Sequence, residues 1–568
     1  MGTLGIVKKV EVRALGRLLA WTAGLATLMV LPTSAYDPIN VPKLLVVAVG
    51  GFMAFGAMVA QRKVLAEKRY RLVLIFGMAF ILDLILVLIV SGTNFTQEFF
   101  GTFGRATGFV AYASLTFLLV AAAIAGHTQT LSKVSWALVT TGGASIVYGL
   151  IQSVDADPVN WVSSYNPVFG FLGNPNFQSS FVGFNGVLVF ALLLNKNYSL
   201  LVRLLLFMDI LLSAYVISTT DSQQGFLVLV GGISIVGIVW IYTSKAKLLT
   251  IPALIVGLIG GIFVTLGSLN SGPLAGLLYK ASVTYRGDYW RAGWKMTIEN
   301  PFFGVGLDSY GDWYRRARTV EATLRRGPDV VSNAAHNVLL DLSSNGGFPL
   351  VFIYLFMIAL VLVSSIKVFR RSQGFNPTFT GLFAVWIAYQ AQSIISLNQL
   401  GLAVWGWIIS GLLIGYEINS RTEIDEAPTN RGASKGRGAS AIAQQKVPAG
   451  VLIGMFVGAV AGFGVGAPPV MASSKLLSAL NSQDPKVVQQ AAYIRPLDAR
   501  YMYLIADILL SNELMAEAAA VSDDSIAKFK DEYGVWTVRS KIEGLPQEEI
   551  NIALREMKRL DPNNPNLK

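Results

Sequence analysis

The sequence predicts an all-α polytopic membrane protein of about 12–13 transmembrane helices, with a large extracytoplasmic loop and a small C-terminal helical domain. Three observations support this prediction. The mean hydropathy of the 568 residues is +0.54. Hydrophobic residues make up 53% of the chain and charged residues only 14%, whereas a soluble protein has about 25% charged residues. Apolar runs of about 20 residues, enough for a helix to cross a bilayer, recur along the chain.

Charge and cysteine content narrow the classes of function. The formal net charge is +11, but basic residues in membrane proteins mostly orient helices, so the charge does not indicate a nucleic-acid partner. The chain has no cysteine, which excludes disulfides, thiolate catalysis and cysteine-ligated metals. Its two histidines are far apart, which argues against a histidine-cluster metal site. The first apolar run follows basic residues but has no convincing cleavage site, so we expect a retained helix.

Basic residues orient the apolar runs. They precede the first run and follow the second at Arg62 and Lys63, so the N-terminus and this loop are expected in the cytoplasm. The later basic loops alternate consistently with this orientation. Nine helices are predicted before residue 269, at about 15–32, 43–61, 72–91, 108–126, 134–152, 178–195, 200–218, 225–243 and 249–268.

The polar stretch 269–347 comes next, and the helix count places it outside the membrane. Further helices are predicted at about 348–366, 379–397 and 402–418, which completes a membrane domain of residues 1–418. Residues 419–447 are basic and rich in Gly, Ser and Ala, as expected of a flexible cytoplasmic linker.

A thirteenth helix, at about 448–466, should carry the chain outward again. Residues 472–568 then form a helical domain outside the membrane. Its paired amphipathic segments and its LDPNNP turn are similar to tetratricopeptide units. A generic helical cap is the alternative interpretation.

The part of the polar stretch from Thr284 to Gly347 combines many charges with Trp, Tyr and Phe. A solvated loop of mixed charge is one interpretation. Because NPFFGVG is too apolar for a free loop, we expect short helices folded over the bundle near the outer membrane surface.

Arg286 and Arg291 lie five residues apart, with Trp290 and Trp294 interleaved. Arginine is always charged and binds phosphate in a bidentate manner, so such a pair suits a lipid-linked phosphate or diphosphate. Interfacial helices rich in Trp and Arg also occur without a ligand, which leaves membrane anchoring as the alternative.

His336, in SNAAHNVLL, is the histidine expected on the outer side. An imidazole with an ordinary pKa of about 6.5 can accept a proton at neutral pH. Asn337 could orient it or an acceptor, although a capping or surface role would also explain this pair. His127, at the cytoplasmic end of its helix, is interpreted as a bystander.

A further outward arginine, Arg105, lies among glycines in FFGTFGRATG. The glycines permit a tight backbone near a ligand, while an interface anchor is the alternative. The Asn174–Pro175–Asn176 segment is a turn signal at a helix start. Asp83 and Asp209 lie inside predicted helices, where an ionisable residue suggests function, so a proton-coupled transporter is an alternative of a different class.

Together these segments resemble the bacterial O-antigen ligase family of membrane glycosyltransferases, which includes Wzy-type polymerases. The resemblance covers about residues 80–415, and the GTFGRATG and GNPNF segments also fit it. The resemblance rests on a large outer loop. This loop opens with Arg and Trp, continues through Pro and Gly-x-Gly, and closes with His-Asn. The matching residues are Arg286, Trp290, Pro301, Gly304, Gly306, His336, Asn337, Gly346 and Gly347.

This resemblance implies a metal-independent, inverting transfer of a glycan from undecaprenyl diphosphate to an acceptor hydroxyl, without a cofactor. His336 would be the general base and Arg286 a diphosphate ligand. Arg291 neighbours the motif and is a further candidate ligand. Many relatives carry Ser-Arg-Gly at a mid-chain turn that reads DSQQG here. We therefore hypothesise that Arg105 supplies the missing charge.

The motifs do not distinguish a ligase from a polymerase or a protein glycosyltransferase. A transporter or flippase, or an inactive envelope scaffold, are alternatives of other classes. The resemblance implies a multi-pass protein of the bacterial cytoplasmic membrane, with its active site facing outside. Its partners would be a lipid-linked oligosaccharide, the bilayer and an acceptor glycan, lipid or protein, with a possible envelope protein bound to the C-terminal domain.

Overall fold

The computed structural model describes residues 3–161, 167–425 and 447–567, and these residues form helices and no strands. Ten helices are long and apolar enough to cross a membrane, and the shorter apolar helix α6 lies among them. This confirms the predicted all-α polytopic membrane fold. Each of the thirteen predicted ranges overlaps one helix, although several ends differ. These helices are α1 (Thr3–Leu28), α2 (Asn40–Ala60), α4 (Arg71–Val90), α6 (Phe109–Ala125), α7 (Thr128–Ser153), α8 (Pro175–Leu193), α9 (Leu200–Thr219), α10 (Gln223–Tyr242), α11 (Thr250–Ser268), α16 (Val338–Arg371), α17 (Pro377–Ser393), α18 (Leu400–Asp425) and α20 (Ala449–Ser482).

Helices α6, α8 and α18 form the centre of the bundle and are buried along most of their length. The indoles of Trp386 and Trp405 are fully buried, and each donates a hydrogen bond of 2.8 Å, to Ser410 Oγ and Thr27 Oγ1. Buried indoles need such partners. The helix α11 lies at the margin with most of its apolar side chains exposed, as expected of a surface that contacts lipid.

A row of glycines fixes α20 against α2. Gly454, Gly458 and Gly462 recur every four residues, and a Cβ on any of them would overlap backbone atoms of α2. Small residues at this spacing allow two membrane helices to approach closely. The thirteenth helix is therefore part of the bundle.

Helix α20 continues to Ser482, beyond the predicted end at about 466 and through Pro468 and Pro469. Its last turns persist because Ala472, Leu476 and Ala479 are buried in the core of the C-terminal domain. That domain consists of α21 (Pro485–Ala491), α22 (Ala499–Ser511), α23 (Met515–Phe529), α24 (Tyr533–Arg539) and α25 (Gln547–Leu560). It is helical as expected, and its tetratricopeptide character stays a prediction. Most of the predicted linker, residues 426–446, lies outside the described residues.

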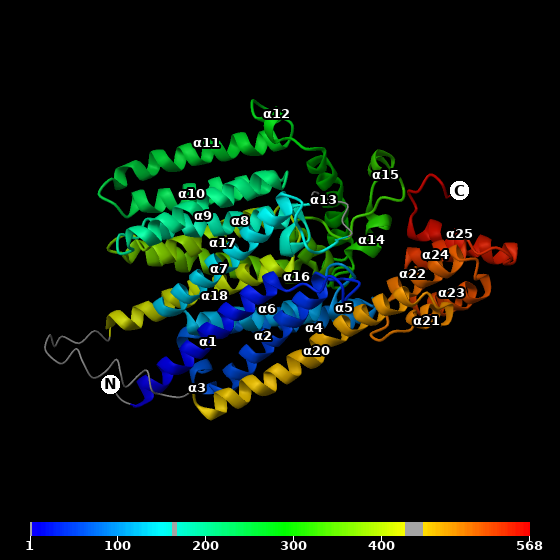
Figure 1. Cartoon of the computed structure of the whole chain (residues 1–568), viewed down its shortest axis with the longest axis horizontal. Coiled ribbons are helices and arrows are strands. Elements are labelled where there is room, and N and C mark those ends of the chain that lie inside the picture. Colours follow the sequence, from blue (N-terminus) through cyan, green and yellow to red (C-terminus); the bar gives the residue numbers. More distant parts are fainter. Residues whose placement is uncertain (1–2, 162–166, 426–446, 568) are drawn as a thin grey trace.

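Four helices of the stretch 269–347 lie at one end of the bundle, the same end that carries the C-terminal domain (Figure 1). They are α12 (Ala275–Leu278), α13 (Ala281–Glu299), α14 (Tyr310–Ala317) and α15 (Val320–Arg326). A cluster of buried aromatic residues, which includes Tyr289, Tyr310 and Tyr314, holds α13 and α14 together. We call this end, where α5 (Phe95–Phe100) also lies, the loop end. The beginning of α1 and the end of α18 lie at the opposite end.

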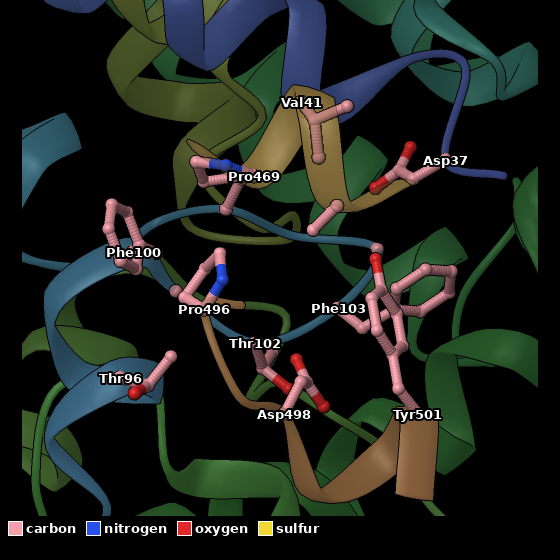
Figure 2. A pocket seen from close by; sticks show the side chains of 14 residues that line it. Asp37, Val41, Thr96, Phe100, Thr102, Phe103, Pro469, Pro496, Asp498 and Tyr501 are labelled. Carbon is pink, nitrogen blue, oxygen red and sulfur yellow. The ribbon is translucent and has the colours of Figure 1, made fainter. Parts of the chain in front are cut away.

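The C-terminal domain packs directly on the loop that carries Arg105. Figure 2 shows Phe103 and Tyr501 beside a small cavity of about 40 Å³, together with Asp37 and Asp498. The rings of Phe103 and Tyr501 are 6.0 Å apart, and the guanidinium of Arg500 lies 4.7 Å from the Phe103 ring. The domain therefore contacts the segment that positions a candidate site residue.

A second contact joins the C-terminal domain to α14. Asp561 is fully buried and accepts hydrogen bonds from Arg318 Nη2 at 2.5 Å and from Arg315 Nη1 at 3.1 Å. Arg318 also donates to the carbonyls of Pro328 and Val330. The LDPNNP turn therefore braces the segment that leads to His336.

Candidate active site

A cavity of about 230 Å³ lies at the loop end, and Arg105, Arg286 and His336 all line it. These residues come from the 101–108 loop, from α13 and from the segment before α16. Amides and a serine from other segments form much of the remaining wall. These polar residues are Asn40, Asn174, Asn176, Gln224, Asn333, Ser396 and Gln399.

His336 adopts a left-handed backbone conformation, with a φ of 53°. Such strain in a residue other than glycine persists only where the surroundings impose it. On one side Ala335 donates its N–H to Asp341 Oδ1 at 2.7 Å, and on the other Asn337 caps α16 by accepting from the N–H groups of Leu339 and Leu340. The imidazole stacks on the Tyr289 ring at 5.4 Å. The contacts of Ala335 and Asn337 and the stacking on Tyr289 therefore fix the position of His336.

The electrostatic surroundings keep His336 neutral. Burial, together with the positive charges of Arg105, Arg286 and Arg326, lowers its pKa to about 3. Burial and nearby like charge both disfavour the protonated form. A neutral imidazole has one nitrogen free to accept a proton.

Arg286 projects into the cavity without an acidic partner. Among the described residues it makes no ion pair, and burial lowers the pKa of its guanidinium. A partly buried guanidinium without a counter-ion is costly unless an anion joins it. This residue therefore fits a role in binding an anionic ligand.

Arg105 is buried, and its loop is anchored by Asp308. Asp308 Oδ2 accepts the backbone N–H of Thr102 at 2.8 Å and that of Thr107 at 3.1 Å. Arg105 Nη1 donates to Asn333 at 3.3 Å, and Nη2 lies 4.0 Å from the Asp341 carboxylate. The arginine far away in sequence thus reaches the same cavity as Arg286 and His336.

Gly304 and Gly306 have φ values of 62° and 104°, which favour glycine. Their segment lies on the kink of α16, where Val305 N–H donates to Ser344 O at 2.8 Å and Phe348 N–H to Pro301 O at 2.7 Å. A Cβ on Gly304 would overlap the backbone of Asn345. These glycines therefore allow their segment to pack closely on the kink of α16. They do not line the cavity themselves.

The comparison with protein families is consistent with this geometry. Residues 208–355 match the family model described as "O-Antigen ligase". This segment belongs to the O-antigen ligase family. It contains Arg286, His336 and the glycines described above, whereas Arg105 and the C-terminal domain lie outside it. No curated protein matches the chain.

Within the O-antigen ligase segment, Arg291 and Trp290 do not line the cavity. The side chain of Arg291 is 60% exposed and pairs with Asp288 at 2.6 Å, and Asp288 also binds Arg325 at 2.7 Å. The Trp290 indole N–H has no hydrogen-bond partner among the residues that the structure describes. Asn337 serves as the cap of α16, as described above.

Sequence reasoning missed Arg326, another cation near His336. Arg326 donates to the Tyr289 hydroxyl and lies 4.4 Å from the Tyr285 ring. It contributes to the lowered pKa of His336. The run of basic residues at 325–326 gave no sign of this position, because its location depends on how α15 folds back toward α13.

The DSQQG turn divides its two glutamines between different surroundings. Gln224 lines the cavity, whereas Gln223 Nε2 donates to the Leu277 carbonyl at 2.5 Å outside it. Gln224 is therefore the residue of this turn that lines the cavity.

The carboxylates of Asp83 and Asp209, inside apolar helices, do not line the cavity. Asp209 accepts from Asn185 Nδ2 at 2.6 Å, and Arg203 donates instead to the Asn195 carbonyl. Asp83 is buried in α4. His127 begins α7 and does not line the cavity either.

Proposed function

We propose that the protein transfers a glycan from an undecaprenyl-diphosphate-linked donor to an acceptor hydroxyl at the outer face of the bacterial cytoplasmic membrane. The observation that carries this proposal is the convergence of Arg105, Arg286 and a neutral His336 on one cavity. The O-antigen ligase segment supports a glycan-transferring ligase or polymerase. The donor, the acceptor and the roles of the residues are our inference.

In this mechanism the two arginines bind the diphosphate and stabilise the charge that develops as it leaves. The bond between the anomeric carbon and the phosphate oxygen breaks, and its electron pair stays on the diphosphate. Guanidinium groups fixed in place before the reaction stabilise such a leaving group without further reorganisation. Arg286 has no acidic partner to displace, and the nearest carboxylate to Arg105 is 4.0 Å away.

The oxygen of the acceptor hydroxyl attacks the anomeric carbon, and His336 accepts the proton of that hydroxyl. Because the attack comes from the face opposite the diphosphate, the configuration at the anomeric carbon is inverted. With a pKa of about 3, the imidazole on its own is a weak base. A bound diphosphate brings negative charge next to the same cations and raises the pKa of the imidazole. Binding of the donor therefore increases the basicity of His336, the residue that promotes the transfer of its glycan.

The identity of the acceptor separates a ligase from a polymerase. A second lipid-linked glycan as acceptor would make the protein a polymerase of the same family. Incubation of the purified protein with the lipid-linked donor alone distinguishes the two: elongated lipid-linked glycans indicate a polymerase, and an unchanged donor indicates a separate acceptor.

The outward orientation can be tested because the chain contains no cysteine. Val331, an exposed residue before His336, is replaced by cysteine and treated in intact cells with a membrane-impermeant maleimide. Labelling supports an outward site, and labelling only after lysis contradicts it. The same cells, with the protein captured under mild detergent, would show whether an envelope protein accompanies it.

The transfer reaction itself is tested with His336→Ala and Arg286→Ala in purified full-length protein. Each is expected to lower transfer by about 10²–10⁴-fold, the range of a lost general base or charge-stabilising group. Lys295→Ala, which removes an exposed cation from the same helix α13, is the matched control and should retain activity. Full transfer by both site variants would contradict the proposal.

A further inference from the structure

Two glutamines in the wall of the cavity have buried amide atoms that form no hydrogen bond with the described residues. Gln399 is 4% exposed, and within this described part of the chain neither its Oε1 nor its Nε2 has a hydrogen-bond partner. Gln224 is 7% exposed, and its Oε1 also lacks a partner. A buried amide without a partner costs free energy, so unsatisfied groups that line a cavity indicate a polar ligand.

The other amides of the cavity are already used within the protein. Asn40 Nδ2 donates to Asp37 at 3.1 Å, and Asn174 Oδ1 caps α8. Asn176 Oδ1 accepts from Ser222, and Asn333 Oδ1 accepts from Arg105. Among the described residues, Gln399 and Gln224 are the amides of this cavity whose side-chain oxygens are buried without a hydrogen-bond partner.

Gln399 is held in place by its neighbour. Asn398 accepts from the Tyr389 hydroxyl at 2.9 Å and donates to the Tyr112 hydroxyl at 3.3 Å. Both of its amide atoms are thus used inside the bundle, and they fix the short segment between α17 and α18. The adjacent Gln399 is left facing the cavity.

Gln224 is fixed in a different way, in the first turn of α10. Ser222 caps this helix by accepting the N–H of Gln224, and its own hydroxyl donates to Asn176. The two glutamines therefore present neutral donors and acceptors from separate rigid elements, in the same cavity as Arg105 and Arg286.

We propose that Gln399 and Gln224 bind hydroxyl groups of the sugar ring that is attached to the diphosphate of the donor. This assignment rests on the proposed function and names the neutral part of its substrate. Amides can donate and accept simultaneously, which matches the neighbouring hydroxyls of a sugar. The cavity is far larger than the roughly 10–15 Å³ that one water molecule needs.

The test compares the binding of two lipids to the full-length protein: undecaprenyl diphosphate, and the same lipid carrying one N-acetylglucosamine. We expect the native protein to prefer the sugar-bearing lipid. Gln399→Met and Gln224→Met should each reduce this preference by about 10-fold, roughly the value of one lost hydrogen bond to a buried polar group. Affinity for undecaprenyl diphosphate should stay unchanged.

Gln223→Met is the matched control, because this neighbouring glutamine lies outside the cavity, and it should keep the native preference. Equal binding of both lipids by the native protein, or an intact preference in Gln399→Met, would overturn the inference. Failure of either lipid to bind would instead contradict the proposed function. In transfer assays, a raised KM for the acceptor with an unchanged KM for the donor would place these amides on the acceptor and contradict our assignment.

Discussion

The buried carboxylate of Asp561 offers a quantitative test of how the C-terminal domain supports the site. Its side chain is 0% exposed, that of Arg318 is 1% exposed, and Arg315 binds the same carboxylate. Asp561→Ala leaves two guanidinium groups without this partner. Breaking a buried ion pair from one side typically costs about 3–5 kcal/mol, which corresponds to roughly a 10²–10⁴-fold change in the docking equilibrium.

Docking can be followed by spin labels, since the chain has no native cysteine. Labels at Leu324→Cys on α15 and Leu554→Cys on α25, both exposed positions, report the separation of the two elements. Urea is added until the distance distribution broadens, and the free energy of undocking is extrapolated to zero urea. Asp561→Ala should lower this free energy by about 3–5 kcal/mol.

Two controls make the result specific. Lys541→Ala removes an exposed ion pair with Asp507 and should cost no more than about 1 kcal/mol. The double change Arg318→Met with Asp561→Leu removes both charges and should cost less than Asp561→Ala alone. An effect of Asp561→Ala no larger than that of Lys541→Ala would refute the reasoning.

Three further predictions concern the surroundings of the cavity. Gly304→Ala should destabilise the protein by about 1–3 kcal/mol, because a left-handed backbone and an overlap with the kink of α16 both oppose a side chain; thermal unfolding measures this. Asp308→Asn should raise the donor KM while retaining the fold, because the carboxylate that anchors the Arg105 loop is lost. Burial raises the pKa of both Asp312 and Glu532, which share a hydrogen bond. The docked state therefore binds protons more readily than the undocked state, so docking should weaken as the pH rises, and the spin-label distances measure this.

Matched changes accompany these three predictions. Gly287→Ala, at a position on α13 with open space around it, should be tolerated where Gly304→Ala is not. A donor KM equal to the native value in Asp308→Asn would show that the loop is held by other contacts. Asp312→Asn should reduce the pH dependence of docking, and an unchanged dependence would exclude this carboxyl pair as its origin.

The sequence predicted the membrane helices well because an apolar run of bilayer length has few alternatives to a spanning helix. It was less informative at ends where polar residues continue a helix. Helix α16 begins at Val338, ten residues before the predicted start. Asn337 is a favoured capping residue, so this signal was present but was assigned to the site.

The candidate site could be predicted only where the chemistry of single residues was unusual. Arg286, Arg105 and His336 were found in this way, and the structure brings them together. Arg291 could have been separated from Arg286 by geometry, because five residues along an α-helix correspond to a rotation of about 140° beyond one turn. The sequence around Gln399 did not indicate a binding role, because that role depends on which residues surround the side chain in the folded protein.

The brace between Arg318 and Asp561 also sets an order of events during biogenesis. Its two members are 243 residues apart, and chains are synthesised at about 5–20 residues per second, so the aspartate follows the arginine by roughly 10–50 s. During this interval the segment before His336 is already made but lacks its support. A newly made chain therefore completes this contact only after its C-terminal domain has been synthesised and has docked.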